Sequence, residues 1–334
     1  VLRSDQRDVL VVIEEVVFAQ AGTSPAGRLL VDFLSLGSIY ALLAMGFVII
    51  FKATQVLNFA HGALAALGAF LVASFATVLQ VPGRWMPGAP LWLRWTLSVL
   101  AALALATIIG MVLERIVIRP MLGEELFAVA IVTLGLDIII RTITNDFIGT
   151  QARPLGDPFG TNVWAIEGFT LIPWTIIAQV ATTIVLVALV ALFFRSRLGI
   201  AMRATAFDQE AARAQGIDVG RVFSISWGIG AFLAGVAGIF LSLFPRRAAG
   251  VDQSTAFFAF AAFPAIILGG LDSVVGAVVG GFAVGLAQAL ATEFLTGISF
   301  LGVGFAGVVP YLLMLAVLLI RPYGLFGSEE IRRV

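Results

Sequence analysis

An all-α, polytopic bundle of transmembrane helices is the fold class that the sequence predicts, and three observations predict it. Hydrophobic residues make up 60% of the 334 residues and charged residues only 12%, and the mean hydropathy is +1.06. A soluble domain carries about a quarter charged residues, so this chain has too little polar surface to cover a globule. Apolar stretches of about 20 residues, enough to cross a bilayer as a helix, recur along the whole chain.

We expect eight or nine membrane elements from these stretches. Seven of them are single uninterrupted spans, which cover about residues 29–51, 56–79, 93–118, 127–148, 172–194, 222–244 and 303–320. The stretch 257–291 is too long for one span and is broken or re-entrant near Gly269–Ser273. Non-helical backbone at membrane depth is tolerated only where protein or a water-filled cavity satisfies its polar groups. Broken helices of this kind are typical of a transporter's substrate site.

The chain divides into a lead-in segment at residues 1–27, a transmembrane domain at 28–327 and a tail at 328–334. Loop 195–221 is the longest charged loop and holds five arginines. Because Lys and Arg beside membrane spans concentrate on the cytoplasmic side, we expect this loop and the tail in the cytoplasm. Alternation of the spans then places loop 149–171 outside.

Glycines indicate close helix packing and an internal repeat. Gly276 with Gly280, and Gly281 with Gly285, form the GxxxG spacing that lets helix backbones approach each other. The segment 36–40 (LGSIY) is a second glycine-marked stretch in the first half of the chain. Paired glycine-interrupted segments in two halves are typical of transporters built from repeats, so the two segments together indicate an internal repeat.

Missing residue types exclude several classes of function. The chain has no cysteine and one histidine, His61, which excludes thiol nucleophiles, disulfides and Cys/His zinc sites. Lys52 is the sole lysine and no glycine precedes it, so the P-loop GxxxxGK followed by Ser or Thr cannot form. We expect no metal or other cofactor in this chain, and ATP, if used, on a separate chain. The zero net charge and the lack of a basic run argue against nucleic acid binding.

Polar residues inside the expected spans are candidates for function, because an ionisable residue costs about 2.5–3.5 kcal/mol at the centre of a membrane helix. Asp137 and Arg141 are four residues apart, share one helix face and can pair. The pair either neutralises itself for structural reasons or takes part in gating or lining a path. Asn58 and His61, three residues apart at the start of the second span, either line a hydrophilic passage or tie helices together.

The charged loop contains a short segment with helix propensity that ends at a glycine. Glu210-Ala211-Ala212 is followed by Gly216. An alanine-rich surface allows another protein to dock closely, and Glu210 with the loop arginines supplies charged contacts. A solvated amphipathic loop helix is the alternative interpretation.

Five segments of the chain, taken in order, resemble segments of one protein family. The chain resembles the permease subunits of branched-chain amino acid ABC importers at segments 38–42 (SIYAL), 58–62 (NFAHG), 67–70 (LGAF), 268–277 (LGGLDSVVGA) and 321–327 (RPYGLFG). The NFAHG segment is similar to the H-type permease rather than to its M-type partner. The resemblance covers about residues 34–327.

The resemblance implies a multi-pass protein of the plasma (cytoplasmic) membrane that is not itself an enzyme. It makes the transmembrane domain a permease domain that provides half of the path for a small solute, most directly branched-chain (aliphatic) amino acids. It implies a second, M-type permease, two cytoplasmic ATP-binding subunits and an extracytoplasmic solute-binding protein as partners.

The resemblance also implies roles for particular residues. Loop 195–221 becomes an EAA-type coupling loop that docks on an ATPase subunit, because Glu210, Ala211, Ala212 and Gly216 fit its EAAxxxG core. The residues expected near the path are Tyr40, Asn58, His61, Gly269 and Gly270.

Three alternatives to this function stay open at this point. Relatives in the same family also carry urea, short amides and other small polar solutes. An ion-coupled secondary transporter would work without partners and would use Asp137 as its coupling carboxylate. An intramembrane enzyme would need a hydrogen-bonded nucleophile and base, and no convincing set is present in the sequence.

Overall fold

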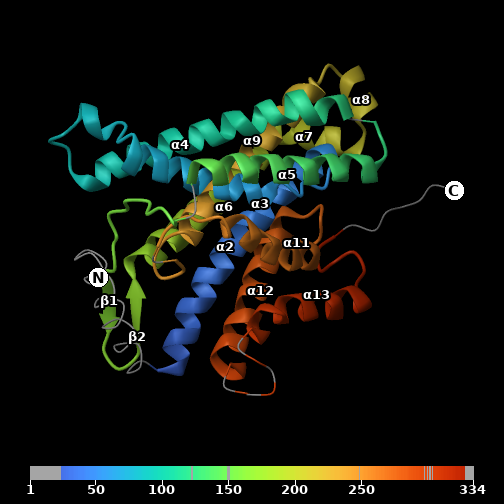
Figure 1. The fold of residues 1–334 in the computed structure, drawn as a ribbon. Helices are drawn as coiled ribbons and strands as arrows, with labels where there is room; N and C mark the ends of the chain where they lie inside the picture. Colours follow the sequence, from blue (N-terminus) through green and yellow to red (C-terminus); the bar gives the residue numbers. More distant parts are fainter. Residues whose placement is uncertain are drawn as a thin grey trace.

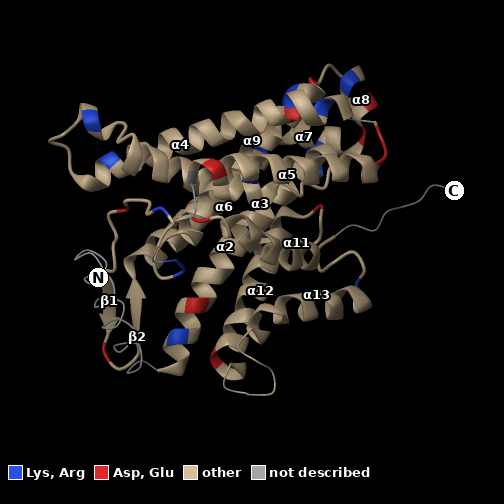
Figure 2. Ribbon diagram, viewed as in Figure 1, with Lys and Arg blue, Asp and Glu red and all other residues tan. Residues whose placement is uncertain are grey.

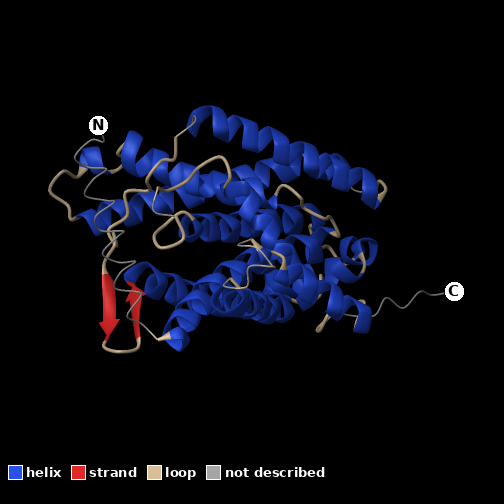
Figure 3. Ribbon diagram, turned by 60° about the horizontal axis from the view of Figure 1, so that its bottom comes forward, coloured by secondary structure: helices blue, strands red, loops and turns tan. Residues whose placement is uncertain are grey.

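The computed structural model describes residues 24–327 except residues 122, 149–150, 248, 297, 299, 301 and 303. Most of the expected lead-in segment 1–27 and the whole tail 328–334 therefore lie outside the described residues. Within the described part, seven helices are long and apolar enough to cross a membrane, and two shorter apolar helices, Thr255–Gly269 and Phe305–Ile320, accompany them. Figure 3 shows that helices dominate the molecule and that strands form one small hairpin.

Figure 1 labels the elements in chain order. The helices of the seven candidate spans are α2 (Pro25–Thr54), α3 (His61–Ala73), α4 (Leu91–Leu113), α5 (Leu126–Ile148), α6 (Trp174–Arg195), α9 (Val219–Leu241) and α12 (Val274–Leu295). The two shorter apolar helices end in α11 (Phe263–Gly269) and α13 (Val309–Ile320). The short elements are α7 (Arg197–Phe207), α8 (Gln209–Ala214), α10 (Thr255–Phe258), β1 (Val163–Ile166) and β2 (Thr170–Pro173). Two π-helical turns, Ser74–Val78 and Glu114–Ile118, continue α3 and α4.

The central helix of the bundle is α2. Ser24 caps its start, because its Oγ accepts the N–H of Gly27 at 3.1 Å, and Pro25 follows where a missing N–H costs nothing. The helix ends at Gln55, whose backbone is left-handed with φ 57°. In its most apolar stretch, 89% of the residues of α2 are buried, against 28% for the spans that contain α4 and α6. Other helices therefore surround α2, whereas α4 and α6 turn most of their apolar surface outward.

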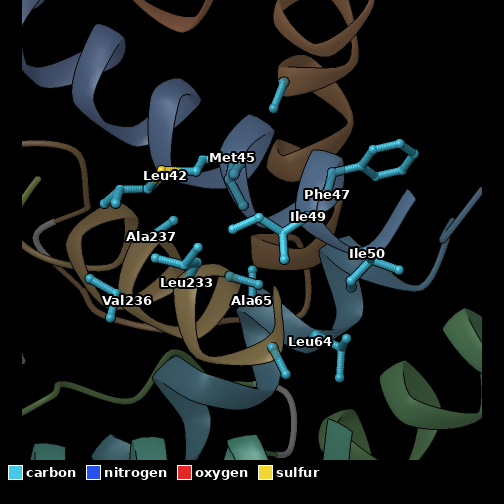
Figure 4. Packing of buried hydrophobic residues seen from close by; sticks show 14 of the residues in the cluster. Leu42, Met45, Phe47, Ile49, Ile50, Leu64, Ala65, Leu233, Val236 and Ala237 are labelled. Carbon is cyan, nitrogen blue, oxygen red and sulfur yellow. The ribbon is translucent and has the colours of Figure 1, made fainter. Parts of the chain in front are cut away.

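Side chains of α2, α3 and α9 make up the core. Figure 4 shows Ile49 of α2, Leu64 of α3 and Leu233 of α9 in one cluster, and each of them is at most 1% exposed. In Figure 1, α3, α4, α5 and α9 form one layer, and α12 and α13 lie on the other side of α2. The short α13 is exposed along most of its length, with Leu319 and Ile320 more than 80% exposed.

Glycines let the backbones of α2 and α12 touch. A Cβ atom on Gly285 would lie 2.5 Å from Cα of Gly37, and one on Gly281 would lie 2.5 Å from Cα of Ala41. The span expected at residues 29–51 is continuous, because α2 passes through Gly37 without a break. Gly37 is needed for close packing against α12 rather than for a turn.

The chain does break between α11 and α12. Gly270 follows α11 with φ +101°, a conformation that L side chains rarely adopt, and Ser273 caps the start of α12 by accepting the N–H of Gly276 at 3.0 Å. The residues after α13 return to this break, where the N–H of Leu325 donates to Leu268 O at 2.8 Å. The segment 324–327 therefore packs against the turn that joins α11 to α12.

The two ends of the bundle differ in structure. We call them the α8 end, which carries α7 and α8, and the hairpin end, which carries β1 and β2. Figure 2 shows several Lys and Arg residues gathered around α7 and α8. At the hairpin end, Phe169 O accepts the N–H of Ser24 at 2.9 Å, so the hairpin holds the start of α2. The sequence had indicated only a loop here; assignment of the α8 end to the cytoplasm stays a prediction.

Candidate functional site

Two buried polar side chains lie at the junction of α2 and α3. His61 is the first residue of α3 and 3% exposed, and Asn58 is 0% exposed. Asn58 lies in the non-helical turn before α3 rather than inside a span that begins at residue 56. Nε2 of His61 lies 3.0 Å from Leu43 O, and since a carbonyl only accepts, Nε2 carries the proton of this bond. The described protein atoms supply no hydrogen-bond partner for Nδ1 of His61 or for either amide atom of Asn58.

A threonine of α5 fixes this turn. Thr133 Oγ1 lies 2.9 Å from Leu57 O and accepts the N–H of Phe59 at 3.2 Å. Its hydroxyl therefore satisfies the backbone groups on both sides of Asn58. The side chain of Asn58 is left as the unsatisfied part of the junction, which is costly for a buried amide unless something else binds it.

Phenylalanine rings from three parts of the chain pack beside this junction. The rings of Phe47 and Phe263 are 5.4 Å apart, those of Phe59 and Phe263 are 5.7 Å apart, and those of Phe260 and Phe263 are 5.8 Å apart. Phe47 also meets the His61 ring edge-on at 6.0 Å. Local sequence patterns do not indicate this phenylalanine cluster, because two of its members lie more than 200 residues from the other two in the chain.

The remaining residues predicted near the path lie elsewhere in the bundle. Tyr40 is buried in α2 and donates its hydroxyl proton to Gln288 Oε1 of α12 at 2.5 Å. Gly269 and Gly270 lie at the α8 end, where a Cβ on Gly270 would lie 2.5 Å from the Gly327 nitrogen. The structure thus places Asn58 and His61 together, Tyr40 against α12, and the two glycines at the break between α11 and α12.

Asp137 and Arg141 form an ion pair on α5, with Arg141 Nη2 and Asp137 Oδ2 2.9 Å apart. Asp137 is 3% exposed. The Arg141 guanidinium also lies over the Phe257 ring, 4.5 Å from its centroid. The pair therefore joins α5 to α10 by a cation–π contact; whether it also gates a path stays a prediction.

The predicted coupling residues lie on and just after α8. Asp208 caps this helix, since its Oδ1 accepts the N–H of Ala211 at 2.9 Å. Glu210 is exposed, whereas Ala212 is 4% exposed and faces the bundle. Gly216 ends the turn with φ +80°. The arrangement leaves Glu210 at the surface and anchors the segment through Ala212.

A second buried polar cluster lies near α8, at the end of the span expected at residues 93–118. Glu114 is 0% exposed and pairs with Arg119 at 2.9 Å. Ser224 of α9 donates to the same carboxylate at 2.6 Å. Glu114 and Arg119 at the end of one span are the only sequence signal for this cluster, and their spacing of five matches no α-helical pairing rule.

Comparison with known proteins gives relatives along most of the chain. A family model described as "Branched-chain amino acid transport system / permease component" matches residues 29–318. The high-affinity branched-chain amino acid transport system permease protein LivH of Escherichia coli K12 is 29% identical, over 90% of this chain and 95% of that protein. The corresponding Pseudomonas aeruginosa protein, BraD, is 30% identical, over 91% of this chain and 97% of that protein.

A chain of a solved structure, PsaBC from Streptococcus pneumoniae in complex with Fab, superposes with a TM-score of 0.45 at 13% identity. The superposition covers 93% of this chain and 97% of that one. This likeness is too distant to support a conclusion.

Proposed function

Because the chain belongs to the family of permease components of branched-chain amino acid transport systems, we propose that it forms half of the path by which an ATP-driven importer carries branched-chain, aliphatic amino acids. Two relatives whose names state that transport align with nine-tenths of the chain. As a multi-pass permease of an ABC system, the protein works with ATPase and binding-protein partners. Residues 28–327 make up its permease domain.

The observation that carries the proposal for the path is the buried, unpaired polar set at the α2–α3 junction. Asn58 offers one N–H donor group and one acceptor, and Nδ1 of His61 offers a further polar atom. These are suitable partners for the ammonium and carboxylate groups of an amino acid. The phenylalanine cluster beside them supplies apolar surface for an aliphatic side chain. In the state described here the rings are in contact, which corresponds to a closed path.

Tyr40, Gly269 and Gly270 act in this proposal as parts of the path wall that change position. Tyr40 holds α2 to α12 through one hydrogen bond, and the turn at Gly270 allows α11 and α12 to move as separate segments. Polar backbone at a helix break is typical of transporter sites. The ion pair of Asp137 and Arg141 borders the same region through Phe257.

Energy enters through the α8 segment, which we assign to the cytoplasm. Exposed Glu210 and Ala211 dock on an ATPase subunit, while Ala212 and Gly216 fix the shape of the segment. ATP binds to the partner chains, because no P-loop can form in this one. We propose two such ATP-binding subunits, an M-type permease that supplies the other half of the path, and an extracytoplasmic solute-binding protein.

Uptake by the reconstituted assembly tests the proposal. The chain, its permease partner, the ATPase subunits and the binding protein are placed in proteoliposomes, and entry of labelled leucine, isoleucine, valine and urea is measured with and without ATP. We expect ATP-dependent uptake of the three amino acids. Uptake of urea alone would assign the chain to the amide-carrying relatives, and uptake driven by an ion gradient without ATP would identify a secondary transporter.

Two variants test the docking role of the α8 segment and the path role of the helix break separately. Glu210→Arg should abolish ATP-dependent uptake while the protein still inserts, because it reverses the charge offered to the ATPase. Gly269→Leu should block uptake without loss of ATPase binding, because the added side chain meets the backbone of Gly276. Normal uptake by either variant would contradict the role given to that segment.

A further inference from the structure

The cluster that connects α4 to α9 behind the α8 segment has no role in the path described above. We propose that Glu114 and Arg119 are positioning residues for energy coupling: they tie the end of α4 to the start of α9, so that a displacement of α8 moves α4. This inference rests on the proposed function, because it requires α8 to be the segment on which the ATPase acts.

The contacts of Arg119 reach two helices at once. Its Nε donates to Glu114 Oε1 at 3.0 Å and its Nη2 lies 2.9 Å from Glu114 Oε2, a bidentate pairing. The same Nη2 lies 2.7 Å from Gly220 O and 2.8 Å from Ser224 Oγ, both on α9. Ser224 completes the ring by donating to Glu114. A charged pair thus joins two membrane helices at one point.

A glycine in the first turn of α9, Gly220, makes room for the side chain of Arg119. A Cβ atom on Gly220 would lie 3.0 Å from Arg119 Nη1 and 3.2 Å from its Cζ, which is tighter than ordinary van der Waals contact. Glycine at this position therefore lets the guanidinium approach the first turn of α9. An alanine there would force the guanidinium away while leaving every charge in place.

The π-helical turn explains how residues five apart can pair. At Glu114–Ile118 the helix is wound with i to i+5 hydrogen bonds, and the N–H of Arg119 donates to Glu114 O. In an α-helix, residues five apart point in different directions, whereas the wider π-turn brings them to the same side. Single π-turns inside α-helices are frequent at functional sites.

The connection from α8 to this cluster is short and well defined. Ile217 donates its N–H to Ala212 O at 3.0 Å, which closes the turn after α8. Asp218 then caps α9 by accepting the N–H of Arg221 at 2.9 Å. Only Gln215–Asp218 separate α8 from α9, so a pull on α8 acts directly on the turn of α9 that holds Arg119.

Coupling is measured as leucine taken up per ATP hydrolysed by the full assembly in proteoliposomes. We expect Arg119→Gln to lower this ratio by about tenfold, within the usual range of coupling energies, while ATP hydrolysis continues. Gly220→Ala, which keeps both charges, should lower the ratio in the same direction. Arg115→Gln is the matched control, because Arg115 lies on the same turn but is exposed, and its ratio should stay at the wild-type value.

A distance measurement distinguishes coupling from simple loss of structure. The chain has no cysteine, so spin labels can be placed at Ile116, on the exposed side of the π-turn, and at Ile139 on α5. In the wild-type assembly the distance between them should change when ATP binds, and in Arg119→Gln it should not.

Three results would overturn the inference: an unchanged coupling ratio in both variants, an equal loss in Arg115→Gln, or a normal ATP-dependent distance change in Arg119→Gln. Failure of the wild-type assembly to transport or to hydrolyse ATP would instead contradict the proposed function, so the two failures are distinguishable.

Discussion

The two buried polar clusters of the bundle are built in opposite ways. At the α2–α3 junction, Asn58 has no partner for either amide atom within the described part of the chain. At the end of α4, Glu114 is equally buried, but both of its oxygens accept hydrogen bonds from Arg119 and one also accepts from Ser224. A satisfied buried network rigidifies the parts that it joins, whereas an unsatisfied one costs free energy unless something else binds it. Hydrogen bonding therefore distinguishes the proposed link from the proposed binding site.

The largest effect is expected from breaking the satisfied cluster. Arg119→Ala leaves the carboxylate of Glu114 buried and unpaired, and should lower the free energy of unfolding by about 3 kcal/mol. Glu114→Ala should cost less, because Arg119 is 34% exposed and can turn toward water. Chemical unfolding in detergent measures both variants. Equal losses of unfolding free energy in the two variants would contradict this prediction. They would show that burial of the remaining partner does not determine the size of the loss.

Removal of one neutral donor from the same cluster should have an intermediate effect. Ser224→Ala deletes a hydrogen bond to a charged group, and should lower the free energy of unfolding by about 1.5 kcal/mol. The same unfolding measurement applies, and Ser226→Ala serves as a control on the same helix, because its hydroxyl bonds only to the Val222 carbonyl within α9. If both serines cost the same, the cluster adds nothing beyond ordinary helix contacts.

A gain rather than a loss of unfolding free energy is expected at the α2–α3 junction. Asn58→Leu keeps the branching and the number of heavy atoms of the side chain and removes two buried polar atoms that have no partner among the described residues, so it should raise the free energy of unfolding by about 1 kcal/mol. Leucine uptake by the assembly should nevertheless fall, because the polar partner of the solute is lost. A destabilised variant would indicate that Asn58 is a structural residue, and the contrast between the two clusters would disappear.

A third, more exposed cluster should show the smallest effect. Burial opposes ionisation of Asp252, but hydrogen bonds from Ser254 and the charge of Arg247 prevail and lower the pKa of Asp252 below its ordinary value. Its stabilising contribution is therefore present above the ordinary pKa of about 4 and is lost as pH falls through the lowered value. Asp252 is 38% exposed, so solvent screening keeps the contribution near 0.5 kcal/mol or less.

Asp252→Asn should lower the free energy of unfolding by this small amount at neutral pH. It should also remove the contribution of this residue to the pH dependence of the free energy of unfolding. A pH series of unfolding curves, compared with that of the unchanged chain, measures both. A loss of unfolding free energy at neutral pH as large as that of Arg119→Ala would contradict the expectation that more deeply buried pairs contribute more to stability.

The sequence was informative where one local rule decides the structure. Apolar stretches located the long helices, and two glycines with Asp272 located the break before α12. The packing role of Gly37 was not visible in the sequence, because a glycine that serves helix packing looks the same in sequence as one that ends a helix. Long-range placement was also out of reach: nothing near Phe59 indicates that Phe263 will stack on it. The roles of the path and coupling residues stay predictions.

Glu114 and Arg119 illustrate a different limit. A pattern search for ion pairs uses the three- and four-residue spacing of α-helices, and a spacing of five escapes it. The π-turn that brings the two residues together depends on tertiary contacts with α9. A pairing of this kind becomes visible only when the local winding of the helix is known.

Unequal helix lengths set a condition on the surrounding lipid. The span that contains α4 has 31 residues, or about 46 Å, whereas the apolar helix Phe305–Ile320, which ends in α13, has 16, or about 24 Å, and both expose apolar side chains. A long helix can tilt to fit a bilayer, but a short one cannot stretch. The membrane must therefore thin beside α13, or another subunit must shield that side. Activity in vesicles should accordingly depend on acyl-chain length.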